Sequence, residues 1–171
     1  SQFARELADR WYGAGTSREW SVVPHLRVVP EKVERERSRK RLGLKPQDLL
    51  VCCFGIVGAF KRNKELLRGW LASSLARDKH CQLVFVGGGL HVAYEDELRE
   101  LAAASGCANR IKTTGWADQQ VYRDYLSAAD IAVQLRGSSR GEASGTAHDC
   151  MAYGIATIVN EHGPFGELPR D

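Results

Sequence analysis

The feature that most constrains the fold of this 171-residue chain is an alternation of short apolar runs with helical segments. Most of the runs are apolar at consecutive positions and all have the length of strands, whereas the segments between them carry apolar residues at helical spacing. The runs lie at 49–57, 82–89, 110–116, 131–136 and 155–160, and the helices at 63–76, 94–106, 118–130 and 144–154. Fully apolar strands joined by helices form parallel sheets that are covered on both faces. The sequence therefore predicts an α/β, Rossmann-like fold.

The first 42 residues follow a different pattern. Residues 1–12 have the apolar spacing of an amphipathic helix. We expect a short strand over Ser21–Pro24 and a highly charged helix over 31–42, with charges typical of a solvated surface.

Composition limits the function classes. The chain is 43% apolar and 26% charged, which is ordinary for a globular protein, and its net charge of +3 is too small to indicate nucleic-acid binding. It contains no apolar run as long as a membrane-spanning helix. Its five cysteines form no C-x-x-C pair, which favours a reducing, cytoplasmic compartment without disulfides or structural zinc. Neither metal-ligand spacing nor a G-x-S-x-G or P-loop motif is present.

Polar and glycine-rich loops follow the predicted strands. In open parallel sheets, ligands bind at the carboxyl ends of the strands. Those ends lie at Gly55–Lys61, Gly87–Leu90, Thr114–Trp116, Arg136–Gly145 and Asn160–Gly166. The clustering of such loops at one edge indicates a ligand site there.

The segment 134–154 carries the strongest signal. Ser144 is a good N-cap, and the small residues after it would let an anion approach the unpaired N–H groups of the first helical turn. Arg136 and Arg140 could add charge-assisted hydrogen bonds, and Asp149 lies one turn further on, within reach of a sugar hydroxyl. A flexible loop before an N-capped helix explains the same residues equally well.

Three other positions carry weaker signals, each with a structural alternative. Lys61 could reach a phosphate from its loop or be merely solvated. Trp116 could stack on a base, although packing on the sheet edge is the interpretation we favour. The glycines at 87–89 allow close ligand approach or a tight turn, but they do not form G-x-G-x-x-G before a helix, so a dinucleotide fingerprint is not supported.

Five motifs in order resemble the carboxy-terminal domain of group 1 (retaining, GT-B fold) glycosyltransferases. They are FGIVGAFK, QLVFVGGG, RIKTTGW, AADIAVQLR and GEASG…DCMAYGIATIVNEHG, and SRGEASG is similar to a bacterial surface-polysaccharide subgroup. The resemblance implies one half of a GT-B architecture. Residues 1–24 would be a remnant of the preceding domain and the hinge, and 25–171 a nucleotide-sugar-binding domain that continues beyond Asp171.

The resemblance also implies roles for single residues. Lys61 matches the diphosphate-binding lysine, and Glu142 matches the first glutamate of E-x7-E, close to the donor sugar. The backbone of Ser144–Thr146 would hold the diphosphate, and Asp149 the ribose. The residues expected to be catalytic are Glu142, Lys61 and Arg140, and those expected to bind the donor are Gly55, Gly58, Lys61, Gly88, Trp116, Arg136, Ser144, Gly145, Thr146, Asp149 and Gly163.

Three departures from the family pattern stand out. Ile56 occupies the place of an arginine that usually binds phosphate, and Arg140 or Arg136 would have to replace it. The spacing from Glu142 to Asp149 is one residue shorter than in E-x7-E, and the second acid is aspartate. The phosphate site is therefore better supported than the ribose contact.

The implied reaction moves a sugar from a nucleotide diphosphate sugar to a saccharide or lipid-linked acceptor in bacterial polysaccharide synthesis. The intact protein would be cytoplasmic, with peripheral membrane association, and would need no metal or cofactor. Because the acceptor site belongs to the preceding domain, we expect this chain alone to bind donor weakly and transfer nothing. Two alternatives stay open: a nucleotide-sugar epimerase or phosphorylase on the same architecture, and a non-catalytic nucleotide-binding Rossmann module.

Overall fold

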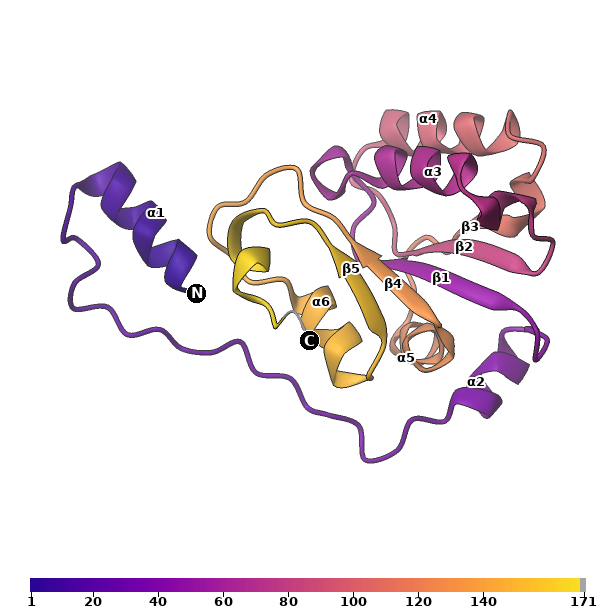
Figure 1. Ribbon diagram of the computed structural model, residues 1–171, viewed down its shortest axis with the longest axis horizontal. Helices are drawn as coiled ribbons and strands as arrows, with labels where there is room; N and C mark the ends of the chain where they lie inside the picture. Colours follow the sequence, from indigo (N-terminus) through magenta and orange to yellow (C-terminus); the bar gives the residue numbers. More distant parts are fainter. Residues whose placement is uncertain (170–171) are drawn as a thin grey trace.

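A computed structural model describes residues 1–169 and confirms the parallel sheet (Figure 1). Its strands are β1 (Leu49–Phe54), β2 (Cys81–Val86), β3 (Ile111–Thr113), β4 (Ile131–Gln134) and β5 (Ala156–Val159). Their order is β3-β2-β1-β4-β5, and all neighbours are parallel. The chain therefore builds outward from β1 in one direction and then returns to its other side. This reversal places the topological switch point, where such sheets bind ligands, between the carboxyl ends of β1 and β4.

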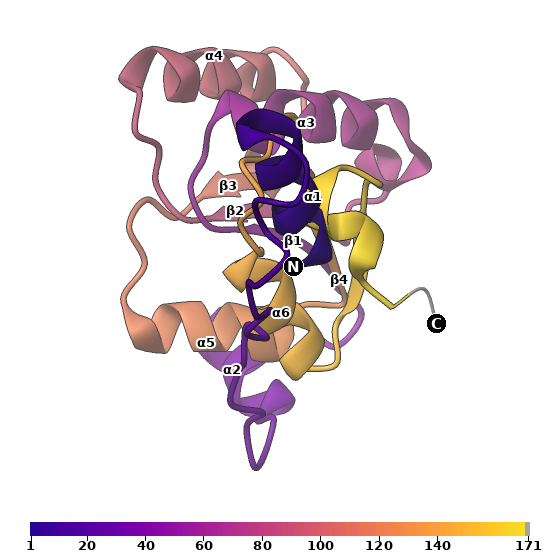
Figure 2. The same cartoon turned by 90° about the vertical axis from the view of Figure 1, so that its left-hand side faces the viewer.

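Helices cover both faces of the sheet, as the two perpendicular views show (Figures 1 and 2). The helices α3 (Asn63–Ala72) and α4 (Val92–Ala103) lie on one face, and α2 (Arg35–Arg41), α5 (Gln119–Ala128) and α6 (Gly145–Ala152) on the other. Short 3-10 turns, η1 to η4, span Ala59–Lys61, Ser74–Arg77, Ala108–Arg110 and Gly163–Glu167. The predicted strands from residue 49 onward and the helices between them are all present, with shorter ends.

Alternate residues of β1 enter two separate apolar cores. Cys53 packs in the core beneath α3 and α4, together with Leu67, whereas Phe54 packs in the core beneath α5 and α6, together with Cys150. This two-sided burial explains why β1 is apolar at consecutive positions. All five cysteines are buried and free, so they pack as small apolar side chains.

Most of the basic helix α2 is exposed, as its composition suggested, but its inner face also carries charge. Arg39 is only 8% exposed, and its guanidinium donates to the carbonyl oxygens of Ala128 and Asp48 and to the Asp130 carboxylate. Arg41 Nε donates to the buried Asp124 of α5 over 2.8 Å. Because these acceptors lie outside α2, Arg39 and Arg41 attach the helix to the rest of the domain.

A long linker, defined as residues 13–34, connects α2 to the first helix, α1 (Gln2–Tyr12), and contains neither helix nor strand. The predicted strand at Ser21–Pro24 is wrong, because Val23 is 82% exposed and no neighbouring strand bonds to it. The helix predicted over residues 1–12 is confirmed, and it lies beside η4, where Glu167 accepts from the Gln2 N–H (Figure 1). Within residues 1–169, no helix has the length and apolarity needed to cross a bilayer.

Candidate functional site

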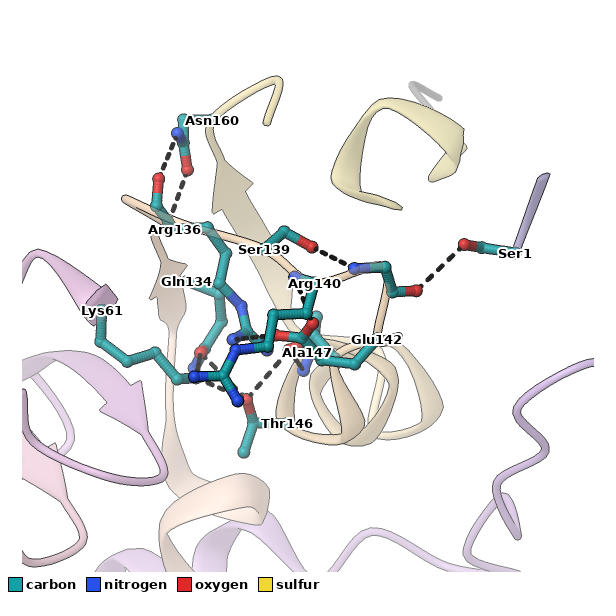
Figure 3. Close-up of polar contacts among 12 residues, drawn as sticks. Ser1, Lys61, Gln134, Arg136, Ser139, Arg140, Glu142, Thr146, Ala147 and Asn160 are labelled. Atoms are coloured by element: carbon teal, nitrogen blue, oxygen red, sulfur yellow. Dashed lines mark hydrogen bonds and ion pairs between the residues drawn. The ribbon is translucent and has the colours of Figure 1, made fainter. Parts of the chain in front are cut away.

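Lys61 lies at the switch point and joins three elements. It ends η1 after β1, and the left-handed Arg62 that follows (φ 52°) turns the chain into α3. Its Nζ donates to Phe54 O of β1 (3.3 Å), to Gln134 Oε1 of β4 (3.2 Å) and to Thr146 Oγ1 of α6 (3.1 Å). Figure 3 shows the last two side chains meeting the ammonium group. The lysine is only 5% exposed, so the interpretation of a solvated side chain is wrong.

The ammonium of Lys61 has no counterion. Its three acceptors are neutral oxygens, and no carboxylate of residues 1–169 forms an ion pair with it. Burial lowers the pKa of Lys61 to about 8, so the group is mostly charged at neutral pH. A buried cation that lacks an anionic partner is costly for the protein, and an anion bound beside it would offset that cost.

Gln134 is a residue of the site that was not predicted from the sequence. It is the last residue of β4 and is fully buried, and its Oε1 accepts from Thr146 Oγ1 (3.1 Å) as well as from Lys61. Its Nε2 has no hydrogen-bond partner in the described part of the chain. A polar residue at the end of the apolar strand IAVQ was a signal that could have identified it.

The amino-terminal turn of α6 forms the other wall. Ser144 Oγ accepts from Ala147 N–H (3.3 Å), which confirms the predicted N-cap. The N–H groups of Gly145 and Thr146 find no acceptor among residues 1–169. Gly55 (φ 96°) lets the end of β1 approach this turn, since a Cβ there would lie 3.0 Å from Thr146 Cγ2 and 3.5 Å from Lys61 Nζ. The turn therefore presents unpaired donors beside a buried cation.

An apolar cavity of about 380 Å³ opens next to this turn. It is lined by Gly55, Ile56, Val86, Gly87, Gly88, Trp116, Ala117 and Tyr122. Trp116 is 92% exposed, so the packing on the sheet edge that we favoured is wrong; the left-handed Gly115 (φ 67°) precedes it. A Cβ at Gly87 would overlap Gly55 O, so no side chain fits there, and the backbone of both glycines lines the cavity. The cavity thus offers an exposed aromatic ring beside bare backbone.

Glu142 forms a separate group with two arginines on the loop before α6 (Figure 3). It accepts from Arg140 N–H (2.7 Å) and pairs with Arg136 Nη1 (3.3 Å). Burial raises the pKa of Glu142, but the N–H donors of Glu142 and Arg140 and the charge of Arg136 outweigh it and hold the pKa below its ordinary value. Glu142 is therefore ionised, and the charge of Arg136 is already engaged by it.

Asp149 has partners on both carboxylate oxygens. Arg27 of the linker donates from Nε to Oδ1 (2.6 Å), and the Tyr122 hydroxyl donates to Oδ2 (2.9 Å). Neither partner was identified from the sequence. The role of Asp149 on a ribose stays a prediction, and any such contact would have to share these oxygens.

Two of the predicted donor-binding glycines have other local roles. The N–H of Gly58 donates to Asn63 Oδ1 (2.8 Å), and Gly163 (φ 61°) lies against Ser139. Over residues 1–169, no group of three or more His, Cys, Asp or Glu side chains is arranged to hold a metal ion. The remaining predicted residues gather around Lys61, the apolar cavity or Glu142.

The strand order and the groups at the switch point define a Rossmann-like α/β domain with a candidate anion site beside an apolar cavity. The family model described as Glycosyl transferases group 1 matches residues 34–171, and the chain belongs to that family.

Similar proteins agree with this assignment. The chain is 31% identical over 137 residues to the lipopolysaccharide core biosynthesis mannosyltransferase LpsB of Rhizobium meliloti (strain 1021), covering 79% of this chain and 38% of that protein. Its fold is similar to that of Anabaena Alr3699/HepE in complex with UDP and glucose (TM-score 0.70, 17% identity, 83% of this chain and 37% of that one). It is also similar to the C-terminal domain of the group 1 family protein LpcC from Francisella tularensis (TM-score 0.69, 22% identity, 84% and 73%). The expected Rossmann-like half of a GT-B architecture is thereby confirmed.

Proposed function

We propose that this chain is the donor-binding domain of a retaining glycosyltransferase. The whole enzyme would transfer a sugar, of the hexose class, from a nucleotide diphosphate sugar to a saccharide or lipid-linked acceptor in bacterial polysaccharide synthesis. The observation that carries the proposal is the buried, unpaired ammonium of Lys61 beside the first turn of α6. The family, the LpsB relative and the UDP bound by HepE support the choice of a nucleotide sugar as the anion.

The apolar cavity, the first turn of α6 and Glu142 lie in an order that fits the base, the diphosphate and the sugar of such a donor. The base would enter the apolar cavity and stack on Trp116, which is exposed at its rim. Gly55 lines that cavity and also lies beside Lys61 and Thr146, so a diphosphate attached to the base would reach the turn. The sugar would extend toward Glu142 on the adjacent loop. One ligand could therefore occupy all three groups.

The chemistry required of this domain is charge stabilisation. As the bond between sugar and diphosphate breaks, negative charge grows on the leaving diphosphate. The Lys61 ammonium and the N–H groups of Gly145 and Thr146 would stabilise it, and we expect no metal to be needed. The peptide donors are held by the helix and do not have to reorganise during the reaction, which is the condition for efficient electrostatic catalysis.

Binding of nucleotides to the 171-residue chain tests the proposal, because the acceptor site is expected in the preceding domain. Calorimetric titration with UDP, GDP, dTDP and ADP should identify one preferred nucleotide. Lys61→Met should weaken its binding at least a hundredfold while the circular dichroism spectrum is unchanged. Lys79→Met, which removes an exposed lysine, is the matched control. Equal affinity of Lys61→Met and the unaltered chain would contradict the proposal, and so would binding of none of the four nucleotides.

Trp116 provides a second test at the other end of the ligand. Trp116→Ala should weaken nucleotide binding about tenfold, since stacking of one base on an aromatic ring contributes about 1–3 kcal/mol. Affinity for inorganic pyrophosphate should not change, because pyrophosphate has no base. A parallel loss for both ligands would place Trp116 outside the base site.

A further inference from the structure

Arg27 lies along one face of α6 and reaches its amino-terminal turn. Gly145 and Asp149 are one helical turn apart and therefore share a face. Arg27 Nε donates to Asp149 Oδ1 over 2.6 Å, while its Nη2 lies where a Cβ on Gly145 would overlap it. The guanidinium thus extends from the second turn of the helix to its first residue, although Arg27 belongs to the linker.

The position of Arg27 is electrostatically unfavourable without a ligand. The amino-terminal end of a helix carries partial positive charge, so a cation beside Gly145 is repelled. The ammonium of Lys61 lies beside the next residue, Thr146, whose Oγ1 is 3.1 Å from Nζ. Two cations therefore flank the turn, and among residues 1–169 only Asp149 pairs with either of them. An anion bound at the turn would interact favourably with both.

One nitrogen of the Arg27 guanidinium is still available as a donor. Nε is used by Asp149 and Nη1 by Leu26 O (3.3 Å). Nη2, the nitrogen that lies against Gly145, donates to no acceptor in the described part of the chain. Asp149 therefore holds the side chain through Nε, and Nη2 is left beside the first turn of α6.

Asp149 is itself fixed by Tyr122. The Tyr122 hydroxyl donates to Oδ2 over 2.9 Å. Burial and the neighbouring Asp149 carboxylate raise the pKa of Tyr122, so the hydroxyl stays protonated and remains a donor. Tyr122 also lines the apolar cavity, so the row of hydrogen bonds from Tyr122 to Asp149 to Arg27 connects that cavity with the helix turn.

We propose that Arg27 is the second diphosphate-binding cation of the site, and that Asp149, held by Tyr122, positions it. The inference rests on the proposed function. It fills the place that Ile56 leaves without a cation, and it favours Arg27 over Arg136, which is paired with Glu142 and lies over the Phe165 ring. Since Arg27 belongs to the linker that joins α1 to the sheet domain, donor binding would also fix the path of that linker.

Inorganic pyrophosphate is the discriminating probe, because it carries the two phosphates without ribose or base. Arg27→Gln should weaken the binding of pyrophosphate and of UDP to the 171-residue chain about tenfold, as expected for the loss of one charge-assisted hydrogen bond. Arg27→Lys should recover part of the loss. Arg18→Gln, which removes an exposed linker arginine, is the matched control and should bind both ligands normally.

Asp149→Asn separates positioning from ribose binding by the sign of the effect. Removing a negative charge near an anion site should by itself tighten pyrophosphate binding. If Asp149 positions Arg27, the variant instead binds pyrophosphate several-fold more weakly, and combining it with Arg27→Gln adds nothing further. Tyr122→Phe should give a smaller loss of the same kind.

Each contrary outcome is distinct. Unchanged pyrophosphate affinity in Arg27→Gln would overturn the role of Arg27. If Asp149→Asn loses affinity for UDP but not for pyrophosphate, Asp149 binds the ribose and does not position Arg27. If Lys61→Met loses pyrophosphate and Arg27→Gln does not, the proposed function stands and this inference fails. Binding of neither ligand by the unaltered chain would overturn both.

Discussion

Arg39 of α2 and Lys61 at the switch point are both buried cations, but their charges are compensated differently. In α2, Arg35 and Arg39 pair with Asp130, and Arg41 pairs with Asp124. At the switch point, Lys61 is buried at least as deeply as Arg39 but contacts only neutral oxygens. The dense run of charges attaches a helix to the domain, whereas the single unpaired lysine marks the candidate ligand site.

The difference shows where a protein tolerates an electrostatic cost. Burial removes water from a charge, and a carboxylate with further hydrogen bonds offsets that loss. The guanidinium of Arg39 receives this compensation from one carboxylate and three carbonyl oxygens. Lys61 does not, and its pKa falls to about 8 as a result. An uncompensated buried charge is expected at sites whose partner is a ligand.

Arg39→Ala should give the largest effect on stability. Removing this guanidinium leaves the Ala128 and Asp48 carbonyl oxygens without this donor, and it leaves the Asp130 carboxylate with Arg35 as its remaining cationic partner. Loss of one partner from a buried pair typically costs about 3 kcal/mol or more, so the free energy of unfolding in urea should fall by that amount. A change below about 1 kcal/mol would show that α2 is attached mainly by apolar contacts.

Lys61→Met should act in the opposite direction. Replacing the unpaired charge by an apolar side chain of similar length removes a desolvation cost, so the free energy of unfolding at pH 7 should rise by about 1–3 kcal/mol. The stabilised variant would at the same time have lost nucleotide binding. Urea unfolding with Lys79→Met as the neutral reference measures this; a clear destabilisation would mean that the ammonium is already compensated in the protein.

The pH dependence of nucleotide binding should follow Lys61. The pKa of the free site is about 8, and a bound diphosphate favours the protonated form. Affinity for UDP should therefore be constant near neutral pH and fall by up to tenfold per unit as pH rises through 8, where the phosphates are already fully ionised. Calorimetry between pH 7 and about 9.5 would show this, and a flat profile would exclude Lys61 as the titrating contact.

Arg37→Ala should give the smallest effect and completes the comparison within one helix. Arg37 pairs with Glu34 at i,i+3, and its side chain is 71% exposed. Exposed pairs of this kind contribute about 0.5 kcal/mol or less, so the free energy of unfolding should be nearly unchanged. Added salt should change the difference between Arg37→Ala and the unaltered chain by no more than that amount. An effect as large as that of Arg39→Ala would show that net helix charge, not burial, determines how α2 is held.

The sequence predicted the parts of the molecule that depend on local pattern. The strands followed from apolar runs, and the α6 N-cap from Ser144, because periodicity and capping act within a few residues. Lys61 was placed at the right loop, but its burial was not foreseen. That burial depends on Thr146, 85 positions further along the chain.

The rest of the site depends on contacts that no local pattern encodes. Arg27 meets Asp149 across 122 positions, and it lies in a linker without periodicity. The exposure of Trp116 depends on a turn that carries the ring away from the sheet. Gln134 is the exception, because a single polar residue within the run 131–136 was visible in the sequence.

The five buried thiols can be used to measure local opening of the domain. A thiol reagent reacts only when a cysteine becomes exposed, so the modification rate of each one measures the free energy of the local opening that exposes it. Cys150 is carried by α6, next to the candidate site, whereas Cys107 lies in the loop before η3. Ligand that binds at α6 should protect Cys150 and leave Cys107 reacting as before. The unmodified chain could thus report occupancy of its site by mass spectrometry, without an engineered label.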